Sequence, residues 1–128
     1  MEPTDLRYHK EHEWIRAQGK QATLGISQFA QDALGDIVFI DLPKVGAPVS
    51  AGDQIGEVES TKTTSSIYTP VSGSILKVNA DLKDHPELVN ADPYGKGWMV
   101  VIDLSEPGQV DALMSAAQYD AFLNSQKQ

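Results

Sequence analysis

The chain has 128 residues, and its 10 lysines and arginines against 18 aspartates and glutamates give a formal net charge of −8. This balance argues against nucleic acid or a membrane as a partner, because both require clustered cations and the basic residues here are scattered singly. The length fits one domain, 1–128, and no apolar run approaches the roughly 20 residues that span a bilayer. The chain has no cysteine, which excludes disulfide scaffolds, zinc ribbons and thiol nucleophiles.

The first ten residues resemble neither a secretory signal nor a transit peptide, so we expect a cytoplasmic protein. From about residue 6 to 26, two strand-like segments flank a polar turn at Gln18-Gly19-Lys20. Strands separated by such a glycine turn predict an N-terminal β-hairpin.

A short helix and a strand are expected next. Ser27 suits the N-cap of a helix from Gln28 to Leu34, and Gly35 suits the left-handed position that ends it. The run 36–42 is β-branched and aromatic. It predicts a strand that is buried on both faces.

Two stretches further along the chain resemble each other. Residues 48–55 and 70–75 each contain Pro-Val-Ser, a glycine turn and a strand. They indicate a duplicated unit, two halves of a small sheet sandwich that close over one core. Between them, residues 56–68 are strand-like at both ends and polar in the middle, so the centre should be an exposed hairpin tip.

The last third of the chain mixes helical and strand signals. Helical and turn signals occur at 80–90, a turn-rich loop follows at 92–97, and residues 98–102 predict a buried strand with Trp98 in the core. Helical periodicity runs from about 107 to 126. The predicted fold is therefore mainly β, with short helices and a C-terminal helical appendage.

His9 and His12 have a superficial likeness to a metal motif, but their spacing is neither HExxH nor its inversion. The segment predicts extended chain, in which positions 9 and 12 face opposite sides of a sheet. No GxSxG, GxGxxG or phosphate-binding GK[ST] loop occurs, so hydrolase, dinucleotide and nucleotide sites have no support. We expect no metal site and no catalytic residue.

Lys62 stands between serines and threonines at the centre of the predicted hairpin tip. By composition alone, a solvated loop lysine is the simplest interpretation. A tight turn on a rigid sandwich, however, holds one amine away from the body, where a modifying enzyme can reach it without unfolding the chain. An acyl group joined there would be an arm on a fixed pivot, and the amide would abolish the lysine charge.

Several uncommon strings occur in one order along the chain: His12–Trp14, Ala30–Phe39, Glu59–Lys62, Ile67–Gly73, Pro86–Asn90 and Asp92–Trp98. Together they resemble the glycine cleavage system H protein family, and the strings around Lys62 resemble its lipoylation site. The resemblance runs nearly end to end. The ordered set is specific, whereas a lone Glu-Ser-x-Lys would be weak.

The resemblance implies a barrel-sandwich hybrid, the fold of lipoyl and biotinyl domains. Its core would span about 20–104, with the N-terminal hairpin at about 6–26 and C-terminal helices at about 107–126. Lipoate would be the covalent cofactor, attached to Lys62. The chain would be a monomeric carrier and a mobile substrate, not an enzyme.

The implied partners are a lipoylating enzyme and the other components of the system. Glycine decarboxylase (P protein) would load an aminomethyl group onto the arm and release carbon dioxide. Aminomethyltransferase (T protein) would pass its methylene to tetrahydrofolate and release ammonia. Dihydrolipoyl dehydrogenase (L protein) would then reoxidise the dihydrolipoyl form.

The resemblance also implies roles for four other residues. Glu13 would lie in a cleft and pair with the cationic amine of the loaded arm, although an ordinary strand carboxylate is the alternative. Glu59, Gly46 and Gly73 match positions that present the site to the lipoylating enzyme. For the two glycines, a turn that requires positive φ is an equally good explanation.

The sequence departs from the family pattern at two cleft positions. Ala33 stands where some members have histidine, and Ser66 stands where many have aspartate. The loaded arm would therefore be held with fewer polar contacts, or by Glu13 with solvent.

Other carrier roles remain open at this point. An H-like protein could relay lipoyl groups to other proteins or serve in sulfur metabolism. Biotin carriage is disfavoured because Thr61 and Thr63 stand where biotin domains usually have methionines. A lipoyl domain of a 2-oxo acid dehydrogenase is disfavoured because its lysine usually sits in a DKA context. A binding module without an arm would leave Lys62 unmodified.

Overall fold

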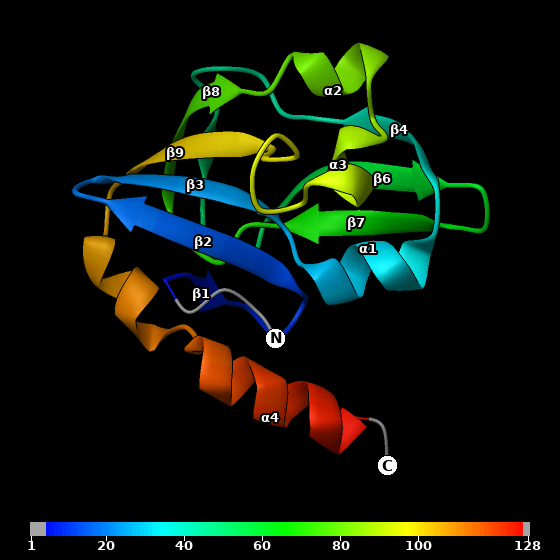
Figure 1. The fold of residues 1–128 in the computed structure, drawn as a ribbon. Helices are drawn as coiled ribbons and strands as arrows, with labels where there is room; N and C mark the ends of the chain where they lie inside the picture. The colour runs from blue at the N-terminus through cyan, green and yellow to red at the C-terminus, as the bar shows by residue number, and fades with distance from the viewer. Residues whose placement is uncertain (1–4, 127–128) are drawn as a thin grey trace.

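The computed structural model describes residues 5–126, which form two antiparallel sheets packed on each other (Figure 1). The strands are β1 (Arg7–Tyr8), β2 (Glu13–Gln18), β3 (Gln21–Ile26), β4 (Ile37–Asp41), β5 (Pro48–Val49), β6 (Gln54–Ser60), β7 (Thr64–Tyr68), β8 (Gly73–Val78) and β9 (Val100–Leu104). The helices are α1 (Gln28–Leu34), α2 (Asp81–Asp84), α3 (Leu88–Ala91), the 3-10 helix η1 (Pro107–Ala112) and α4 (Ala116–Gln126).

The six-stranded sheet has the order β1-β2-β3-β9-β8-β5, and the three-stranded sheet has the order β4-β6-β7. The two sheets do not close into one barrel. The prediction of a mainly β sandwich with short helices and a C-terminal helical appendage is confirmed. The predicted N-terminal hairpin is present as β2 and β3, with β1 added at its outer side.

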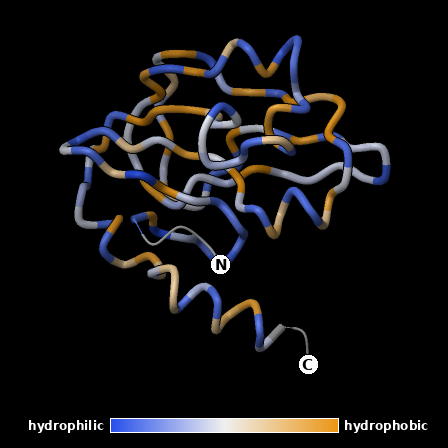
Figure 2. The backbone as a smooth tube through the Cα atoms, in the orientation of Figure 1, coloured by the Kyte–Doolittle hydropathy of each residue, from blue (hydrophilic) through white to orange (hydrophobic). Residues whose placement is uncertain are grey.

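The main core lies between the two sheets and follows from side-chain alternation. Along β6, Val58 and Ser60 are buried, whereas Glu57 and Glu59 are exposed. This period of two is what a strand with one buried face requires. Apolar side chains of the larger sheet face them, among them Ile15, Leu24, Ile75 and Ile102. In Figure 2 the β6–β7 loop is coloured as hydrophilic, while apolar residues recur along the strands.

Helix α1 begins and ends as predicted. Ser27 Oγ accepts a hydrogen bond from the N–H of Ala30 (3.2 Å), and Gly35 adopts a φ of +82° after the last turn. Asn90 of α3 ties this end of the helix to β4. Its amide donates to the carbonyl of Gly35 (2.9 Å), and its Oδ1 accepts from the N–H of Ile37 (2.9 Å).

The expectation that residues 36–42 form a strand buried on both faces is wrong. Val38 and Phe39 of β4 are 50% and 54% exposed. β4 is an edge strand, and its register with β6 shifts between Ile37 and Phe39, an irregularity that re-aims side chains. The apolar run predicts a strand correctly, but the partner strand decides which side chains face inward.

The two Pro-Val-Ser stretches lie side by side. β5 pairs with β8, with Pro48 opposite Ser74 and Val49 opposite Gly73. The stretches lead into β6 and β8, which belong to different sheets. Between them, β6 and β7 form the predicted hairpin.

The placement of Trp98 in the core is also wrong. The predicted strand 98–102 is shifted, because β9 begins at Val100, and Trp98 is only partly buried in the preceding loop. Trp14 is the fully buried tryptophan, and its indole N–H donates to the carbonyl of Pro93 (3.0 Å). Gly25 leaves room for the ring, since a Cβ there would lie 2.7 Å from it.

The predicted appendage consists of η1 and α4, and α4 packs beneath β1 (Figure 1). Ser115 and Gln118 cap α4 reciprocally, because Ser115 Oγ accepts from the N–H of Gln118 (3.2 Å) and Gln118 Oε1 accepts from the N–H of Ser115 (2.8 Å). Tyr119 stacks on Tyr8 with ring centroids 4.6 Å apart. Across residues 5–126, no helix has the length and apolar character needed to cross a bilayer.

Replacement of the two tryptophans should rank them by burial. Trp14→Ala should lower the free energy of unfolding by about 3 to 5 kcal/mol, the range for a fully buried large side chain. Trp98→Ala should cost clearly less, because part of its ring is already in water. Urea unfolding of both variants measures the difference, and equal losses would contradict the packing described here.

Candidate functional site

The tip of the β6–β7 hairpin is a tight turn that hydrogen bonds to Ser60 stabilise. Ser60 is buried, its Oγ accepts from the N–H groups of Lys62 and Thr63 (both 3.1 Å), and its own N–H donates to the carbonyl of Thr63 (2.8 Å). The N–H of Thr61 donates to the carbonyl of Asp36 (3.0 Å), which ties the tip to the segment after α1. Serine side chains commonly fix turns in this way. The backbone at Lys62 is therefore held in place.

The side chain of Lys62 is exposed, as expected for the hairpin tip, and it forms no ion pair with a carboxylate of residues 5–125. Its stem crosses the end of α1, since a Cβ built on Gly35 would lie 3.0 Å from Lys62 Cε. Gly35 therefore meets two needs, the positive φ that ends the helix and the space for the lysine stem.

A narrow cleft of about 140 Å³ lies between α1 and β7, next to this hairpin. Its apolar walls are Ile26, Phe29, Ala30, Ala33, Leu34, Val58 and Ile67, and its polar lining residues are Glu11, His12, Glu13, Ser65 and Ser66. The sequence pointed to Glu13, Ala33 and Ser66, and the fold brings all three to this one cleft. A mostly apolar cleft with a few convergent polar groups is the usual form of a small-molecule site.

Glu13 is 1% exposed and both of its carboxylate oxygens are partnered. Oε1 lies 2.9 Å from His9 Nδ1, and Oε2 accepts from the N–H of Tyr68 (3.1 Å). Burial raises the pKa of the Glu13 carboxyl above its ordinary value, and the hydrogen bonds from His9 and Tyr68 oppose the rise. Burial and these contacts distinguish Glu13 from an ordinary exposed strand carboxylate.

The segment between β1 and β2 is a tight turn, so the expectation of extended chain at residues 9–12 is wrong. The N–H of His9 donates to the carbonyl of Glu13 and the N–H of His12 to the carbonyl of His9, both at 2.9 Å. His12 adopts a φ of +74°, the one positive value at a non-glycine residue in the described range. A left-handed residue leaves no trace in an alternation pattern, and the turn places His9 against Glu13.

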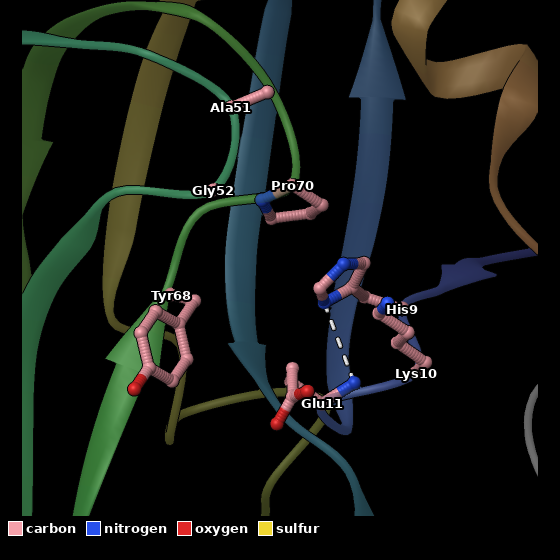
Figure 3. A pocket seen from close by; sticks show the side chains of 7 residues that line it. All are labelled: His9, Lys10, Glu11, Ala51, Gly52, Tyr68 and Pro70. Atoms are coloured by element: carbon pink, nitrogen blue, oxygen red, sulfur yellow. Dashed lines mark hydrogen bonds between the residues drawn. The ribbon is translucent and has the colours of Figure 1, made fainter.

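The two histidines of this turn differ in their surroundings. His12 Nδ1 lies 2.8 Å from the hydroxyl of Tyr119, and burial lowers the pKa of the His12 imidazole. His9 borders a second cavity of about 480 Å³, which it lines with Lys10, Glu11 and Tyr68 (Figure 3). Within the part of the chain that the structure describes, no three His, Asp or Glu side chains gather in a way that could hold a metal ion.

Glu59 lies on the exposed face of β6, near Lys62 but outside the cleft. It stands opposite Phe39 of β4 on one side and Thr64 of β7 on the other. Glu57 lies two residues earlier on the same face and is also exposed. Both carboxylates are therefore open to a macromolecular partner.

The two glycines singled out by the sequence line neither the cleft nor the lysine turn. Gly46 has a φ of +90° in an exposed turn, and its N–H donates to the carbonyl of Ile75 (2.7 Å), which fits the turn explanation. Gly73 lies at the start of β8, where a Cβ would collide with the carbonyl oxygen of Asp103. A close backbone approach, not a turn, requires glycine there.

Comparison with known proteins decides the family. The family model described as Glycine cleavage H-protein matches residues 6–126. The chain belongs to the glycine cleavage H-protein family. The glycine cleavage system H protein of Myxococcus xanthus is 52% identical over 123 residues, which cover 96% of this chain and 95% of that one. The H protein of Geobacillus kaustophilus is 50% identical over 122 residues, with coverage of 95% and 96%.

A solved structure agrees with the sequence comparison. The crystal structure of the glycine cleavage system H protein of Mycobacterium marinum matches with a TM-score of 0.85 and 42% identity, over 93% of this chain and 96% of that one. The family resemblance seen in the sequence is thereby confirmed. Ala33 and Ser66, the two positions at which the resemblance led us to expect departures, both line the cleft, and the carboxylates of its described lining belong to Glu11 and Glu13.

The stability of a Glu13→Gln variant should depend on pH. Because the folded-state pKa of Glu13 is raised, its favourable contribution is complete below the ordinary glutamate pKa of about 4.3 and is lost as the pH rises through the raised value. A permanently neutral glutamine escapes this loss. Relative to wild type, Glu13→Gln should therefore gain unfolding free energy between pH 4 and pH 8 in urea titrations.

Glu87 provides the control with the opposite sign. Hydrogen bonding to its own backbone N–H lowers the pKa of this exposed carboxyl. Glu87→Gln should therefore lose stability relative to wild type as the pH rises. If the unfolding free energy of Glu13→Gln relative to wild type changed with pH in the same direction as that of Glu87→Gln, the raised pKa of the buried Glu13 carboxyl would be contradicted.

Proposed function

We propose that this chain is the lipoyl-bearing carrier of the glycine cleavage system, with the lipoyl group joined to Nζ of Lys62. The observation that carries the proposal is an exposed lysine, without a carboxylate partner among residues 5–125, on a turn whose backbone Ser60 fixes. The amide would form between lipoate and the lysine amine with loss of water, and would remove the charge. When bound, the lipoyl group would supply a disulfide that accepts the aminomethyl group of glycine on one sulfur, and it would be left as a dithiol once that group has been passed on.

The surroundings of Lys62 fit such a group. The lysine stem crosses Gly35 at the end of α1. Leu34, which precedes Gly35, and Ser65, three residues after Lys62, line the cleft. The apolar walls suit a hydrocarbon arm. The carboxylate of Glu13 suits a cationic amine at its end.

The protein body would protect the cargo instead of transforming it. The apolar side chains of Phe29, Leu34 and Ile67, which line the cleft, would limit water around a seated arm, and Glu13 would pair with the positive charge of its amine. The chain contributes no catalytic residue in this role and acts as a mobile substrate. Its compartment, the cytoplasm, and its monomeric state stay predictions.

The proposed partners all act on the one arm. A lipoylating enzyme attaches it, glycine decarboxylase loads it, aminomethyltransferase unloads it and dihydrolipoyl dehydrogenase reoxidises it. The net charge of −8 favours basic contact surfaces on these enzymes. No observation favours the relay or sulfur-metabolism role.

Intact mass spectrometry tests the attachment. Protein from cells supplied with lipoate should carry the lipoyl mass, and Lys62→Ala should lack it. Lys20→Ala is the matched control, because Lys20 lies exposed at the tip of the other hairpin, β2–β3. Lys62→Arg should change the unfolding free energy by less than about 0.5 kcal/mol, as exposed substitutions usually do. Lipoyl mass retained in Lys62→Ala would refute the assignment.

Reconstitution tests the carrier role itself. The lipoylated wild-type protein should support glycine-dependent methylene transfer with the decarboxylase and the aminomethyltransferase.

A second test concerns presentation of the lysine. If the lipoylating enzyme contacts Glu59, Glu59→Gln should slow lipoylation several-fold in a time course followed by intact mass. Glu57→Gln is the matched control on the same exposed face of β6. Equal rates for the two variants would show that net charge, not position 59, governs recognition.

A further inference from the structure

The carboxylate of Glu13 is held between a fixed donor and a titratable one. The backbone N–H of Tyr68 at Oε2 cannot lose its proton at any physiological pH. The imidazole of His9 at Oε1 is a side chain that exists in a neutral form and in a protonated, cationic form. His9, which contacts Glu13 without lining the cleft itself, therefore decides whether the Glu13 carboxylate is balanced by an adjacent cation.

The proton on His9 Nδ1 follows from the geometry. An ionised carboxylate only accepts hydrogen bonds, so Nδ1 must carry a proton when it lies 2.9 Å from the charged Oε1. The neutral imidazole then has a free acceptor at Nε2. Protonation at Nε2 turns a neutral donor into a cation without breaking the bond to Glu13.

The backbone conformation of the β1–β2 turn brings His9 and Glu13 together. The turn from His9 to Glu13 closes with the N–H of His9 on the carbonyl of Glu13, and it needs His12 at a φ of +74°. Non-glycine residues in that region cost free energy and cluster at functional sites. The side chain of His9 is only 20% exposed, so its imidazole is confined against the carboxylate.

No other titratable side chain among the described residues around His9 contacts the Glu13 carboxylate as His9 does. Lys10, Glu11 and Tyr68 line the cavity of 480 Å³ with it (Figure 3). Tyr8 lines a smaller cavity that His9 also borders. The N–H of Glu11 approaches Nδ1 at 3.4 Å, a contact in which Nδ1 accepts and which therefore competes with the bond to Glu13. The contact with Glu13 Oε1, at 2.9 Å, is the shorter of the two and needs the proton on Nδ1 when Glu13 is charged. His12 points to Tyr119. Among described residues, His9 is the basic side chain within ion-pair distance of Glu13.

We propose that His9 is a positioning residue of the cleft. In its neutral form it orients the Glu13 carboxylate and leaves its negative charge for a cationic amine. In its protonated form it neutralises Glu13 and displaces the amine. This inference rests on the proposed function, because the amine is the cargo of the arm.

The unmodified full-length chain provides a test that needs no lipoyl group. Methylammonium chloride serves as the probe, and the Glu13 carboxyl resonance in NMR reports both binding and the fraction of Glu13 ionised. Tetramethylammonium chloride controls for ionic strength, because it has the charge but no N–H donor. The affinity of wild type for methylammonium, corrected for the fraction of Glu13 that is ionised, should fall about tenfold from pH 8 to pH 5.5. Tenfold corresponds to about one pKa unit, the smallest shift that one adjacent charge usually causes.

Two substitutions of His9 separate its charge from its contact. His9→Asn keeps a neutral donor, so its corrected affinity should change less than twofold over the same range. His9→Phe removes the donor and should raise the midpoint of the Glu13 titration. His85→Asn is the matched control, because His85 forms an exposed pair with Glu87 at 3.2 Å, and it should behave as wild type. The proposal would be overturned if the corrected methylammonium affinity fell equally in wild type and His9→Asn. It would also be overturned if the midpoint of the Glu13 titration were the same in His9→Phe as in wild type.

The loaded carrier gives a second readout. The rate of ammonia release from Glu13→Gln divided by that from wild type is a protection ratio in which the intrinsic pH dependence cancels. Taken in each background against the matching Glu13→Gln variant, this ratio should fall about tenfold from pH 8 to pH 5.5 when residue 9 is histidine and less than twofold in the His9→Asn background. A parallel fall in both backgrounds counts against His9. Absence of lipoyl mass on Lys62 would refute the proposed function alone, since the methylammonium titration still decides the role of His9.

Discussion

One buried carboxylate joins the two sheets of this fold. Glu13 belongs to β2 of the six-stranded sheet, and it accepts a hydrogen bond from the N–H of Tyr68 in β7 of the three-stranded sheet. A charge taken out of water is costly unless donors replace its hydration, and here each oxygen has one. The bond crosses from sheet to sheet at the place where the cleft lies. The same group therefore links the two sheets and is one of the polar groups that line the cleft.

The C-terminal helix supports the cleft from outside. The hydroxyl of Tyr119 lies 2.8 Å from His12 Nδ1 and 2.7 Å from the Oγ of Ser27. His12 forms part of the cleft lining, and Ser27 caps α1, which forms one wall. Hydrogen bonds that share one hydroxyl couple the groups they join. The appendage is thus part of the framework that shapes the site, although none of its own residues lines the cleft.

Rigidity and mobility are divided between backbone and side chain at the lysine. Ser60 and the carbonyl of Asp36 fix the backbone of the hairpin tip, while the stem of Lys62 keeps its rotatable bonds and reaches over Gly35. A fixed base limits the region that an attached arm can search, which raises the effective concentration of its end near the cleft. On the proposed function, one arm would thus be available both to the cleft and to other proteins.

The sequence by itself determined the features that depend on neighbouring residues. The Ser27 cap, the Gly35 stop and the exposed turn at Lys62 are each specified within a few positions, because capping and turn chemistry act locally. Only the tertiary structure decided that Trp14 is fully buried and that His9 contacts Glu13. Burial depends on which strands meet across the sandwich, and the contact depends on a left-handed turn that no periodicity reveals.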